Sequence, residues 1–378
     1  MQPASTAQPP GSDSPADARG VRASHLLAAM VALIGADNLL LLRFLGVTSP
    51  ILWIGASLAL AILLAALLQV RDGARVPVGR LLLCLALGIG IMALGGEGRL
   101  FYANADWIIR YTVLADMARW PWPYAYAGAG DTILRAPIGM YLLPALAGKI
   151  GGQGAMDGAL LAQNGLLLGA LLAIGSTFFA TARARRIALA VVLAFSGMDT
   201  LGQLLIDPAG LWPLYAHIEG WANSLQYSSN ITLAFWVPQH ALIGWIGALA
   251  FLLWRTERLP LACFLAIVPV TMIWSPLGVM GTLPFAAYAG LETLLRKRLK
   301  PIDIALPLAA LVLAAAPVVY LQTNAGKVGF HLSFPNPALY VVFVLLEAVP
   351  FLALVWIGSR GGRFGRGPFA LIAACLLL

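Results

Sequence analysis

Apolar stretches, each close to the length of a membrane-crossing helix, follow one another along almost the whole chain. They lie at residues 24–44, 51–70, 81–94, 159–181, 187–205, 241–254, 259–274, 302–321 and 338–357. A helix needs about 20 apolar residues to cross a bilayer. Hydrophobic residues make up 60% of the sequence, against about 45–50% in a soluble domain. The sequence therefore predicts an all-α, polytopic transmembrane helical bundle of about nine or ten spans.

Two further apolar segments look too short or too irregular to cross. Residues 137–149 would form a helix of about 20 Å, and the hydrocarbon core is about 30 Å thick. Residues 276–295 contain Gly278, Gly281 and Pro284, which interrupt a regular helix. Irregular backbone at membrane depth is tolerated where it lines a cavity or is buried in protein. We therefore expect half-length helices at both places, around an outward-facing cavity.

The remaining sequence indicates a single membrane domain with a polar tail. Residues 1–23 are rich in Pro, Ser, Ala and Asp, a composition that predicts a disordered cytoplasmic tail. Residues 24–378 form one transmembrane domain, with large outer loops at 96–149 and 206–240 and some interfacial helices. The last stretch, 368–378, begins an apolar helix that is too short to cross the membrane.

The distribution of Lys and Arg predicts the orientation, because basic loops favour the cytoplasmic side. With a cytoplasmic N-terminus the inner segments hold the basic residues 19, 22, 71, 75, 80, 183, 185, 186, 255, 258, 296, 297, 298, 300, 360, 363 and 366. The outer segments hold only residues 99, 110, 119, 135, 149 and 327. This asymmetry favours a multi-pass protein of the bacterial inner membrane, with its N-terminus cytoplasmic. The net charge of +8 is then a topology signal, and no nucleic-acid partner is expected.

The first outer loop is basic against this trend, and its carboxylates are candidates for catalysis. An anionic ligand such as a lipid phosphate would explain the arginines; contact with anionic lipids, or pairing with Asp106, Asp116 and Asp131, would explain them equally. Asp106, with Arg110 one helical turn on, is placed to act as a general base on an acceptor hydroxyl. The plainer alternative is an i,i+4 ion pair on an interfacial helix. Asp116 is a second candidate, and Asp131 follows a Gly-Ala-Gly stretch typical of a turn.

Aromatic and titratable residues in both outer loops complete the candidate set. Trp120 and Trp122, in a Trp-Pro-Trp-Pro-Tyr run, are typical of an interfacial aromatic belt but could also stack on a sugar. The second loop supplies Glu219 and His240, which are candidate catalytic groups. No spacing typical of a zinc site is present. A divalent cation, Mg²⁺ or Mn²⁺, could still bridge a carboxylate and a phosphate.

Three acidic residues, Asp37, Asp199 and Glu347, fall inside apolar spans. Ionisable groups in a membrane are costly and suggest a function. Asp199 is best placed to face the cavity. These residues support an alternative in which the chain is a transporter or flippase of a lipid-linked or small anionic solute.

Several elements together resemble the N-terminal core of GT-C-type integral membrane glycosyltransferases. They are Asp106 early in the first large outer loop, Arg135-Ala-Pro137 opening a short helix, Gly148-Lys-Ile-Gly151 at its end, and the Arg183-Ala-Arg-Arg186 cluster after the next span. The resemblance covers about residues 80–190. It implies that Asp106 is the catalytic base and that Arg135 contacts the phosphate of a polyprenyl-linked donor.

The chain is more closely similar to a set of bacterial multipass proteins of unassigned function. They share Asp106-Trp107, Tyr141-Leu-Leu-Pro-Ala145 and the Gln-Tyr-Ser-Ser-Asn and Trp-Val-Pro-Gln-His elements within residues 226–240.

We therefore expect a membrane glycosyltransferase that moves a sugar from a polyprenyl-phosphate donor to a lipid, glycan or protein acceptor on the extracytoplasmic side. Its partners would be the lipid-linked sugar donor and membrane lipids. The expected catalytic residues are Asp106, Asp116, Glu219 and His240. The expected substrate-binding residues are Arg110, Arg135, Lys149, Trp120, Trp122, Tyr227 and Gln239. Besides the transporter, a non-catalytic assembly subunit is a third possibility.

Overall fold

The chain folds into a helical bundle in which strands are nearly absent from the residues that can be described. The computed structural model describes residues 20–101, 104–126, 132–133, 136–195, 197–211, 218–223, 225–328, 336–360 and 372. The only strands in these ranges are two short antiparallel pairs, β1 (Gly20–Arg22) with β2 (Arg75–Pro77) and β3 (Ala125–Tyr126) with β4 (Thr132–Ile133). The all-α fold class is thereby confirmed.

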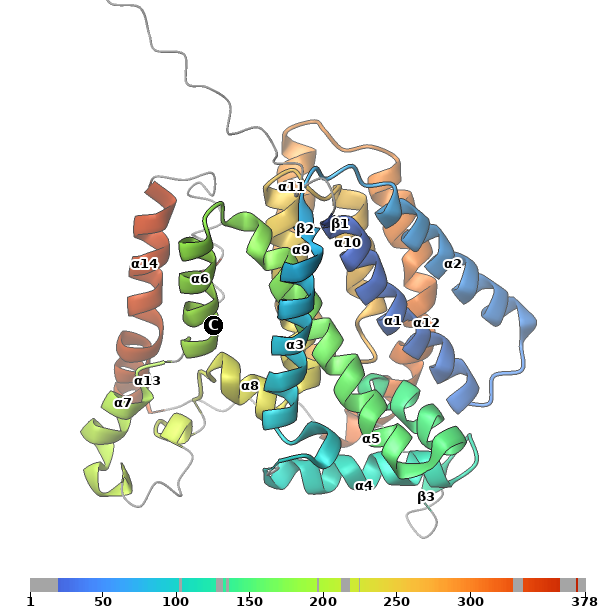
Figure 1. Cartoon of the computed structure of the whole chain (residues 1–378), viewed down its shortest axis with the longest axis horizontal. Helices are drawn as coiled ribbons and strands as arrows, with labels where there is room; N and C mark the ends of the chain where they lie inside the picture. Colours follow the sequence, from blue (N-terminus) through green and yellow to red (C-terminus); the bar gives the residue numbers. More distant parts are fainter. Residues whose placement is uncertain are drawn as a thin grey trace, which may run out of the picture.

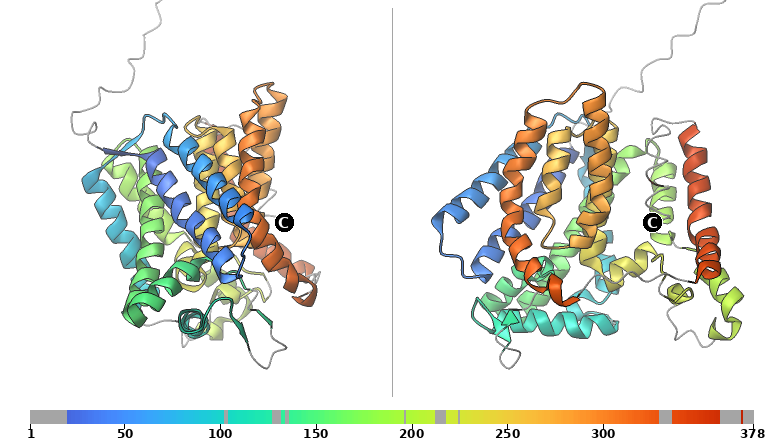
Figure 2. Two further views of the ribbon diagram at one scale, coloured as in Figure 1. Left: turned by 90° about the vertical axis from the view of Figure 1, so that its right-hand side faces the viewer. Right: turned by 180° about the vertical axis from the view of Figure 1, so that it is seen from behind.

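Eight helices form the main bundle, and a ninth lies across one of its ends (Figure 1). The bundle helices are α1 (Ala23–Phe44), α2 (Pro50–Leu68), α3 (Val78–Leu94), α5 (Gly139–Gly175), α9 (Pro238–Arg255), α10 (Leu261–Val270), α11 (Pro276–Leu295) and α12 (Ile302–Val328). Helix α4 (Ala105–Arg119) runs roughly perpendicular to them, and all the views in Figures 1 and 2 place it at the same end. This end carries the first predicted outer loop.

A smaller group of helices stands beside the bundle and is linked to it by α8 (Asn230–Trp236). Its members are α6 (Ala182–Ala194), α7 (Asp199–Ile206), α13 (Pro337–Phe343), the π-helical η6 (Val344–Ala348) and α14 (Val349–Arg360). Phe195 after α6 contacts Phe351 of α14, with ring centroids 4.6 Å apart. Four single turns complete the described helices: η2 (Glu97–Arg99), η3 (Ser176–Phe178), η4 (Pro208–Leu211) and η5 (Ile218–Gly220).

Six helices in the described part of the chain are long and apolar enough to cross a membrane. They are Ala23–Phe44, Pro50–Leu68, Gly139–Phe178, Ala182–Ile206, Ile302–Gln322 and Pro337–Ile357, where Ala182–Ile206 takes α6 and α7 together across the break between them. Two further apolar helices, Val78–Leu94 and Leu261–Val270, are shorter. The chain is thus a multi-pass membrane protein, although this measure gives fewer crossings than the nine or ten expected.

The short segment expected at 137–149 does form a helix that folds back on the next one. Gly152 interrupts α5 with φ 73° and ψ −167°, a conformation that glycine adopts without strain. The two arms pack against each other, since the side-chain amide of Gln163 donates to the carbonyl of Met140 at 2.9 Å. Residues 139–151 therefore form a short arm and residues 153–175 a long one, which together we call the α5 hairpin.

The second half-length helix was predicted in the wrong place. Helix α11 is continuous over its 20 residues, and Pro284 inside it does not break it. The shortened helix is instead α10, which has 10 residues and ends at Val270. Pro276 occupies the first turn, where a missing N–H costs nothing, whereas Pro284 lies in the interior and removes one backbone hydrogen bond without ending the helix.

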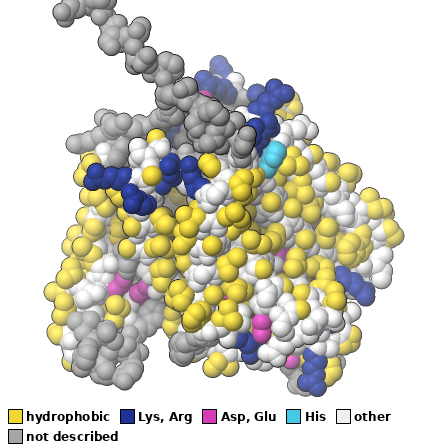
Figure 3. Space-filling view, viewed as in Figure 1, with side chains coloured by type: hydrophobic (Ala, Val, Ile, Leu, Met, Phe, Trp, Pro, Cys, Tyr) yellow, Lys and Arg dark blue, Asp and Glu magenta, His cyan; other side chains and the backbone are white. Residues whose placement is uncertain are grey.

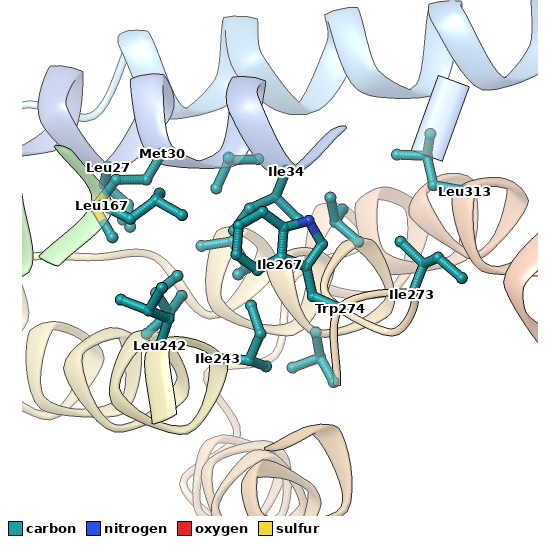
Figure 4. Packing of buried hydrophobic residues seen from close by; sticks show 14 of the residues in the cluster. Leu27, Met30, Ile34, Leu167, Leu242, Ile243, Ile267, Ile273, Trp274 and Leu313 are labelled. Atoms are coloured by element: carbon teal, nitrogen blue, oxygen red, sulfur yellow. The ribbon is translucent and has the colours of Figure 1, made fainter. Parts of the chain in front are cut away.

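The turn between α10 and α11 lies in the middle of the hydrophobic core. Trp274 is completely buried there, among side chains from α1, α5, α9 and α12 (Figure 4). Its indole N–H donates to Asp37 Oδ2 at 2.9 Å. The other carboxylate oxygen of Asp37 accepts from the backbone N–H of Leu143 at 3.1 Å, and the N–H of Gly139 donates to the carbonyl of Ile273. Asp37, expected as a functional intramembrane charge, is thus bonded to the turn and to the start of the α5 hairpin.

The end opposite α4 carries the basic segments that were predicted to share one side. Arg258 contacts Asp72 at 3.3 Å and Thr177 Oγ1 at 2.8 Å, which joins three loops at this end. Lys and Arg side chains gather most densely there in Figure 3. Residues 20–22 of the expected tail pair with β2, so part of the expected tail belongs to the fold, whereas residues 1–19 lie outside the described part.

Helices α3 and α5 approach each other through glycines. A Cβ placed on Gly88 would lie 2.3 Å from the carbonyl oxygen of Gly165, and one on Gly169 would lie 2.5 Å from the Cα of Leu85. Gly165 and Gly169 are four residues apart, the small-xxx-small spacing of closely packed membrane helices. The crossing therefore requires glycine on both helices.

We expect Gly88→Ala to lower stability by about 1–3 kcal/mol, because the added methyl group would force the helices apart. Gly90→Ala is the matched control on the same helix, since a Cβ there meets nothing within 4 Å. Thermal unfolding of the purified variants in detergent measures the difference. Equal melting temperatures for the two variants would contradict the close crossing.

Candidate functional site

Helix α4 begins with an asparagine cap and is fastened at this end to α8. The Oδ1 atom of Asn104 accepts from the N–H of Asp106 at 3.1 Å, which satisfies one of the free amides at a helix start. The side-chain amide of Asn104 and the indole N–H of Trp107 donate to the carbonyl of Phe235, at 2.8 and 2.9 Å. That carbonyl belongs to the last turn of α8 and has no partner within its own helix. The two predicted outer loops therefore meet here.

Arg110 is the centre of this meeting point. Its Nη1 donates to Gln239 Oε1 at 2.8 Å and to the hydroxyl of Tyr141 at 3.2 Å, and its Nη2 donates to the carbonyl of Trp236 at 2.7 Å. Nη2 also lies 3.5 Å from Asp106 Oδ2. A cation at the C-terminus of α8 is favoured by the helix dipole. Arg110 thus joins α4, the α5 hairpin, α8 and α9.

Asp106 and Arg110 differ sharply in exposure. The Asp106 side chain is 43% exposed and that of Arg110 only 11%. The terminal nitrogens of Arg110 are bonded to protein groups, so Arg110 positions Asp106, and its contact with a donor phosphate stays a prediction. Asp106 is the more accessible of the two side chains.

Glu97 is a second carboxylate near Arg110 that the sequence reasoning missed. It is 1% exposed, and its Oε1 accepts from the side-chain amide of Asn164 at 2.9 Å. Burial raises the pKa of Glu97 well above its ordinary value, although Asn164 and the positive charge of Arg110 act in the opposite direction. The sequence carries one signal for Glu97, because it is a lone Glu shortly after an apolar span.

Polar atoms of Glu97 and Arg110 are buried without partners. Glu97 Oε2 and Arg110 Nε have no hydrogen bond to any described residue. A buried acceptor or donor without a partner costs about 1–3 kcal/mol. Stability alone therefore does not explain this cluster, which marks it as a candidate functional site.

Tyr111 fixes the turn that carries Glu97. Its hydroxyl donates to the carbonyl of Gly96 at 2.7 Å, and the N–H of Arg99 donates to the hydroxyl at 3.3 Å. Burial is the main cause that raises the pKa of Tyr111 to about 12, so its hydroxyl stays protonated and can donate this bond at neutral pH.

His240 also belongs to this region, whereas Glu219 does not. His240 Nδ1 is 2.7 Å from the hydroxyl of Ser275, which caps α11, and its ring is within electrostatic reach of Arg110. Glu219 lies at the opposite end of α8, where it accepts from the N–H of Ser229 and the hydroxyl of Thr232, at 3.1 and 2.6 Å. The seven residues of α8 separate the two ends by about 10 Å.

The structure does not bring the remaining predicted residues to Asp106. Lys149 donates to the carbonyls of Ala118 and Trp120, so it satisfies the C-terminal end of α4, about 20 Å from Asp106 along the helix. Trp120 stacks on Tyr124, and Trp122 packs on Phe44 and bonds to the carbonyl of Met117. Asp116 is also at this end, within electrostatic reach of Tyr124.

The other predictions concern α6, α14 and residues outside the described part. Tyr227 stacks on Phe351, with centroids 6.0 Å apart. Asp199 is not inside a continuous helix, because α6 ends at Ala194 and Asp199 begins α7. Glu347 accepts from the N–H of Met198 beside it, at 3.0 Å. Arg135, Asp131 and His217 lie outside the described residues.

The described residues contain no group of three or more His, Cys, Asp or Glu side chains that could hold a metal ion. The exposed carboxylate of Asp106 offers oxygen ligands, which Mg²⁺ and Mn²⁺ prefer. Any cation here would need further ligands from a substrate phosphate.

We expect the pH dependence of stability to report the buried charge of Glu97. Because its folded-state pKa is raised, its contribution to stability is fully present below the ordinary value of 4.5 and is lost as the pH rises through the folded-state pKa. Glu97→Gln removes this loss and keeps an oxygen for Asn164. The melting temperature of Glu97→Gln relative to wild type should therefore increase between pH 5 and pH 9. A difference that stays constant over this range would show that folding does not raise the pKa of Glu97.

Comparison of the chain with profiles of known protein families, with curated proteins and with solved structures finds no match.

Proposed function

We propose that this chain is a membrane glycosyltransferase that moves a sugar from a polyprenyl-phosphate donor to an acceptor hydroxyl at the end of the bundle where α4 lies. The observation that supports this proposal is the convergence of Asp106 and Arg110 with Gln239 and His240. These residues come from two loops more than a hundred positions apart in the sequence. Arg110 contacts Asp106 and Gln239 directly, and His240 lies within its electrostatic reach.

In the proposed reaction Asp106 is the general base. The acceptor oxygen attacks the sugar carbon that carries the phosphate, and its proton passes to the Asp106 carboxylate. The new carbon–oxygen bond forms as the bond to the phosphate oxygen breaks, and the polyprenyl phosphate leaves with the bonding electron pair. Such proton transfer typically contributes 10²–10⁴-fold to the rate.

The other residues act around this step. Arg110 holds the Asp106 carboxylate in place, and Gln239 and Tyr141 hold Arg110. His240 stands beside Gln239 at the start of α9 and can bond the acceptor. The proposal includes contact of Arg135 with the donor phosphate, because guanidinium groups bind phosphate oxygens through charge-assisted hydrogen bonds. It also includes a divalent cation between that phosphate and Asp106, because such cations prefer oxygen ligands.

Removing the base is the direct test. With a polyprenyl-phosphate-linked sugar and a hydroxyl acceptor, Asp106→Asn should release free polyprenyl phosphate at least about 10²-fold more slowly than wild type. Asp116→Asn, on the same helix, is the matched control and should stay within a few-fold. Melting temperatures of Asp106→Asn and Asp116→Asn that equal that of wild type establish that folding is not the cause. Full activity in Asp106→Asn would exclude the proposed base.

A transporter or flippase remains a second candidate because of one observation at the break between α6 and α7. Glu347 accepts from Met198 N–H and from the indole of Trp221, at 3.0 and 3.1 Å, and Asp199 and Glu219 both lie within its electrostatic reach. Both Asp199 and Glu347 are buried. Paired carboxylates at a helix break inside a membrane are typical of ion-coupled transport.

The two candidates give opposite results in proteoliposomes that contain the lipid-linked donor. For a flippase, the donor would reach the opposite leaflet intact, and Glu347→Gln would abolish movement while Asp106→Asn would not. For the transferase, we expect free polyprenyl phosphate to accumulate, and Glu347→Gln should retain this activity if it folds. Accessibility of the donor to an added membrane-impermeant hydrolase measures its movement between leaflets.

A further inference from the structure

A separate cleft lies between the second half of α4 and the turn of the α5 hairpin. Its volume is about 280 Å³. Its polar lining comes from Arg99, Arg119 and Gln153, and small residues such as Ala115, Gly148 and Gly152 leave the space open. The hairpin touches α4 beside the cleft, since a Cβ on Gly148 would lie 3.0 Å from that of Ala118. The turn itself needs glycine at 152, because φ is +73° there.

The cleft presents two guanidinium groups with unused donors. Arg119 lies over the ring of Trp120, 5.0 Å from its centroid, and makes no ion pair with a described residue. Arg99 uses Nε to contact Asp157 Oδ2 at 3.1 Å and stacks on Tyr111 at 4.0 Å, which leaves its two terminal nitrogens without a described partner. Asp157 offsets one of these positive charges, so the pair of arginines still gives the cleft a net positive character.

The backbone holds Arg99 in an unusual conformation. Its φ is +56°, and Gly96 and Gly98, which both precede it, also have positive φ. A residue other than glycine in this region costs about 1 kcal/mol or more and persists where the surroundings fix it, often at ligand sites. Here the ring of Tyr111 and the carboxylate of Asp157 fix the side chain toward the cleft.

The surroundings of the cleft indicate what kind of anion fits. Apolar side chains are exposed beside it, with Ile150 at 82%, Leu100 at 65% and Phe101 at 57%. Arginine pairs bind phosphate oxygens through several charge-assisted hydrogen bonds. The volume is at the lower end for ligand pockets, about 300–1,000 Å³, so it suits a headgroup and not a whole lipid-linked sugar. We propose that this cleft binds the phosphate group of a membrane lipid through Arg99 and Arg119.

This site is independent of the proposed transferase centre. At 3.6 residues per turn and 1.5 Å per residue, Arg119 projects about 140° around α4 from Asp106 and about 20 Å further along. Neither proposal therefore depends on the other.

The test measures binding of short-chain phosphatidic acid to the full chain in a maltoside detergent. Tryptophan fluorescence and native mass spectrometry are the two readouts. Dioctanoylglycerol, which lacks the phosphate, and inorganic phosphate are the comparison ligands. We expect phosphatidic acid to bind at least about tenfold more tightly than either one. Arg119→Gln and Arg99→Gln should each weaken its binding at least about tenfold. Ala115→Leu should weaken it similarly by filling the cleft without changing charge.

Arg43→Gln is the matched control, because Arg43 is an exposed arginine at the same end of the bundle and does not line the cleft. It should bind phosphatidic acid like wild type. Equal weakening by Arg43→Gln would show general surface attraction and overturn the site. Unchanged binding in folded Arg119→Gln and Ala115→Leu would overturn it as well. Inorganic phosphate binding as tightly as phosphatidic acid would replace the lipid with a soluble anion.

Discussion

Backbone polar groups inside a bilayer must find partners within the protein, and in this chain the buried carboxylate of Asp37 supplies them. The α5 hairpin starts, and α10 ends, in the middle of the core, so both leave amides and carbonyls where no water competes. Asp37 accepts from the N–H of Leu143 and from the indole of Trp274, and Gly139 donates to Ile273. These bonds allow two shortened helices to end at membrane depth. A carboxylate near a helix start is also favoured by the helix dipole.

The placement of α4 follows from this arrangement. The hairpin returns to the end of the bundle at Gly152, where Lys149 satisfies the final carbonyls of α4. The first turn of α4 is held by α8, whose last carbonyls accept from Asn104, Trp107 and Arg110. Helix α4 is therefore fixed at both ends. Its side chains contribute Asp106 to one polar site near its start and Arg119 to the cleft near its end. The short α8 is itself matched to its dipole, with Glu219 at its start and Arg110 at its end.

The sequence predicted those features that depend on length, composition and local spacing. It predicted the helical membrane fold, the short helix at 137–149 and the pairing of Asp106 with Arg110, which an i,i+4 spacing permits. It did not predict that Lys149 caps α4, since a lysine in a basic loop looks the same whether it binds a ligand or a carbonyl. Glu97 was missed because its importance depends on Asn164, which is distant in sequence. The meeting of Glu347 with Met198 depends on tertiary packing and on a helix break that apolar composition does not reveal.

Arg110 separates two carboxylates whose surroundings give them different tasks. Glu97, the first residue of η2, is buried against α5 and its charge is disfavoured by burial, whereas the Asp106 side chain is 43% exposed. Of these two carboxylates, only Asp106 is open to solvent. Glu97 instead lies within electrostatic reach of Arg110, whose positive charge favours its ionised form. Two carboxylates with contrasting environments around one cation are a common basis for dividing acid and base roles, and in this chain they are placed by helices that no local pattern links.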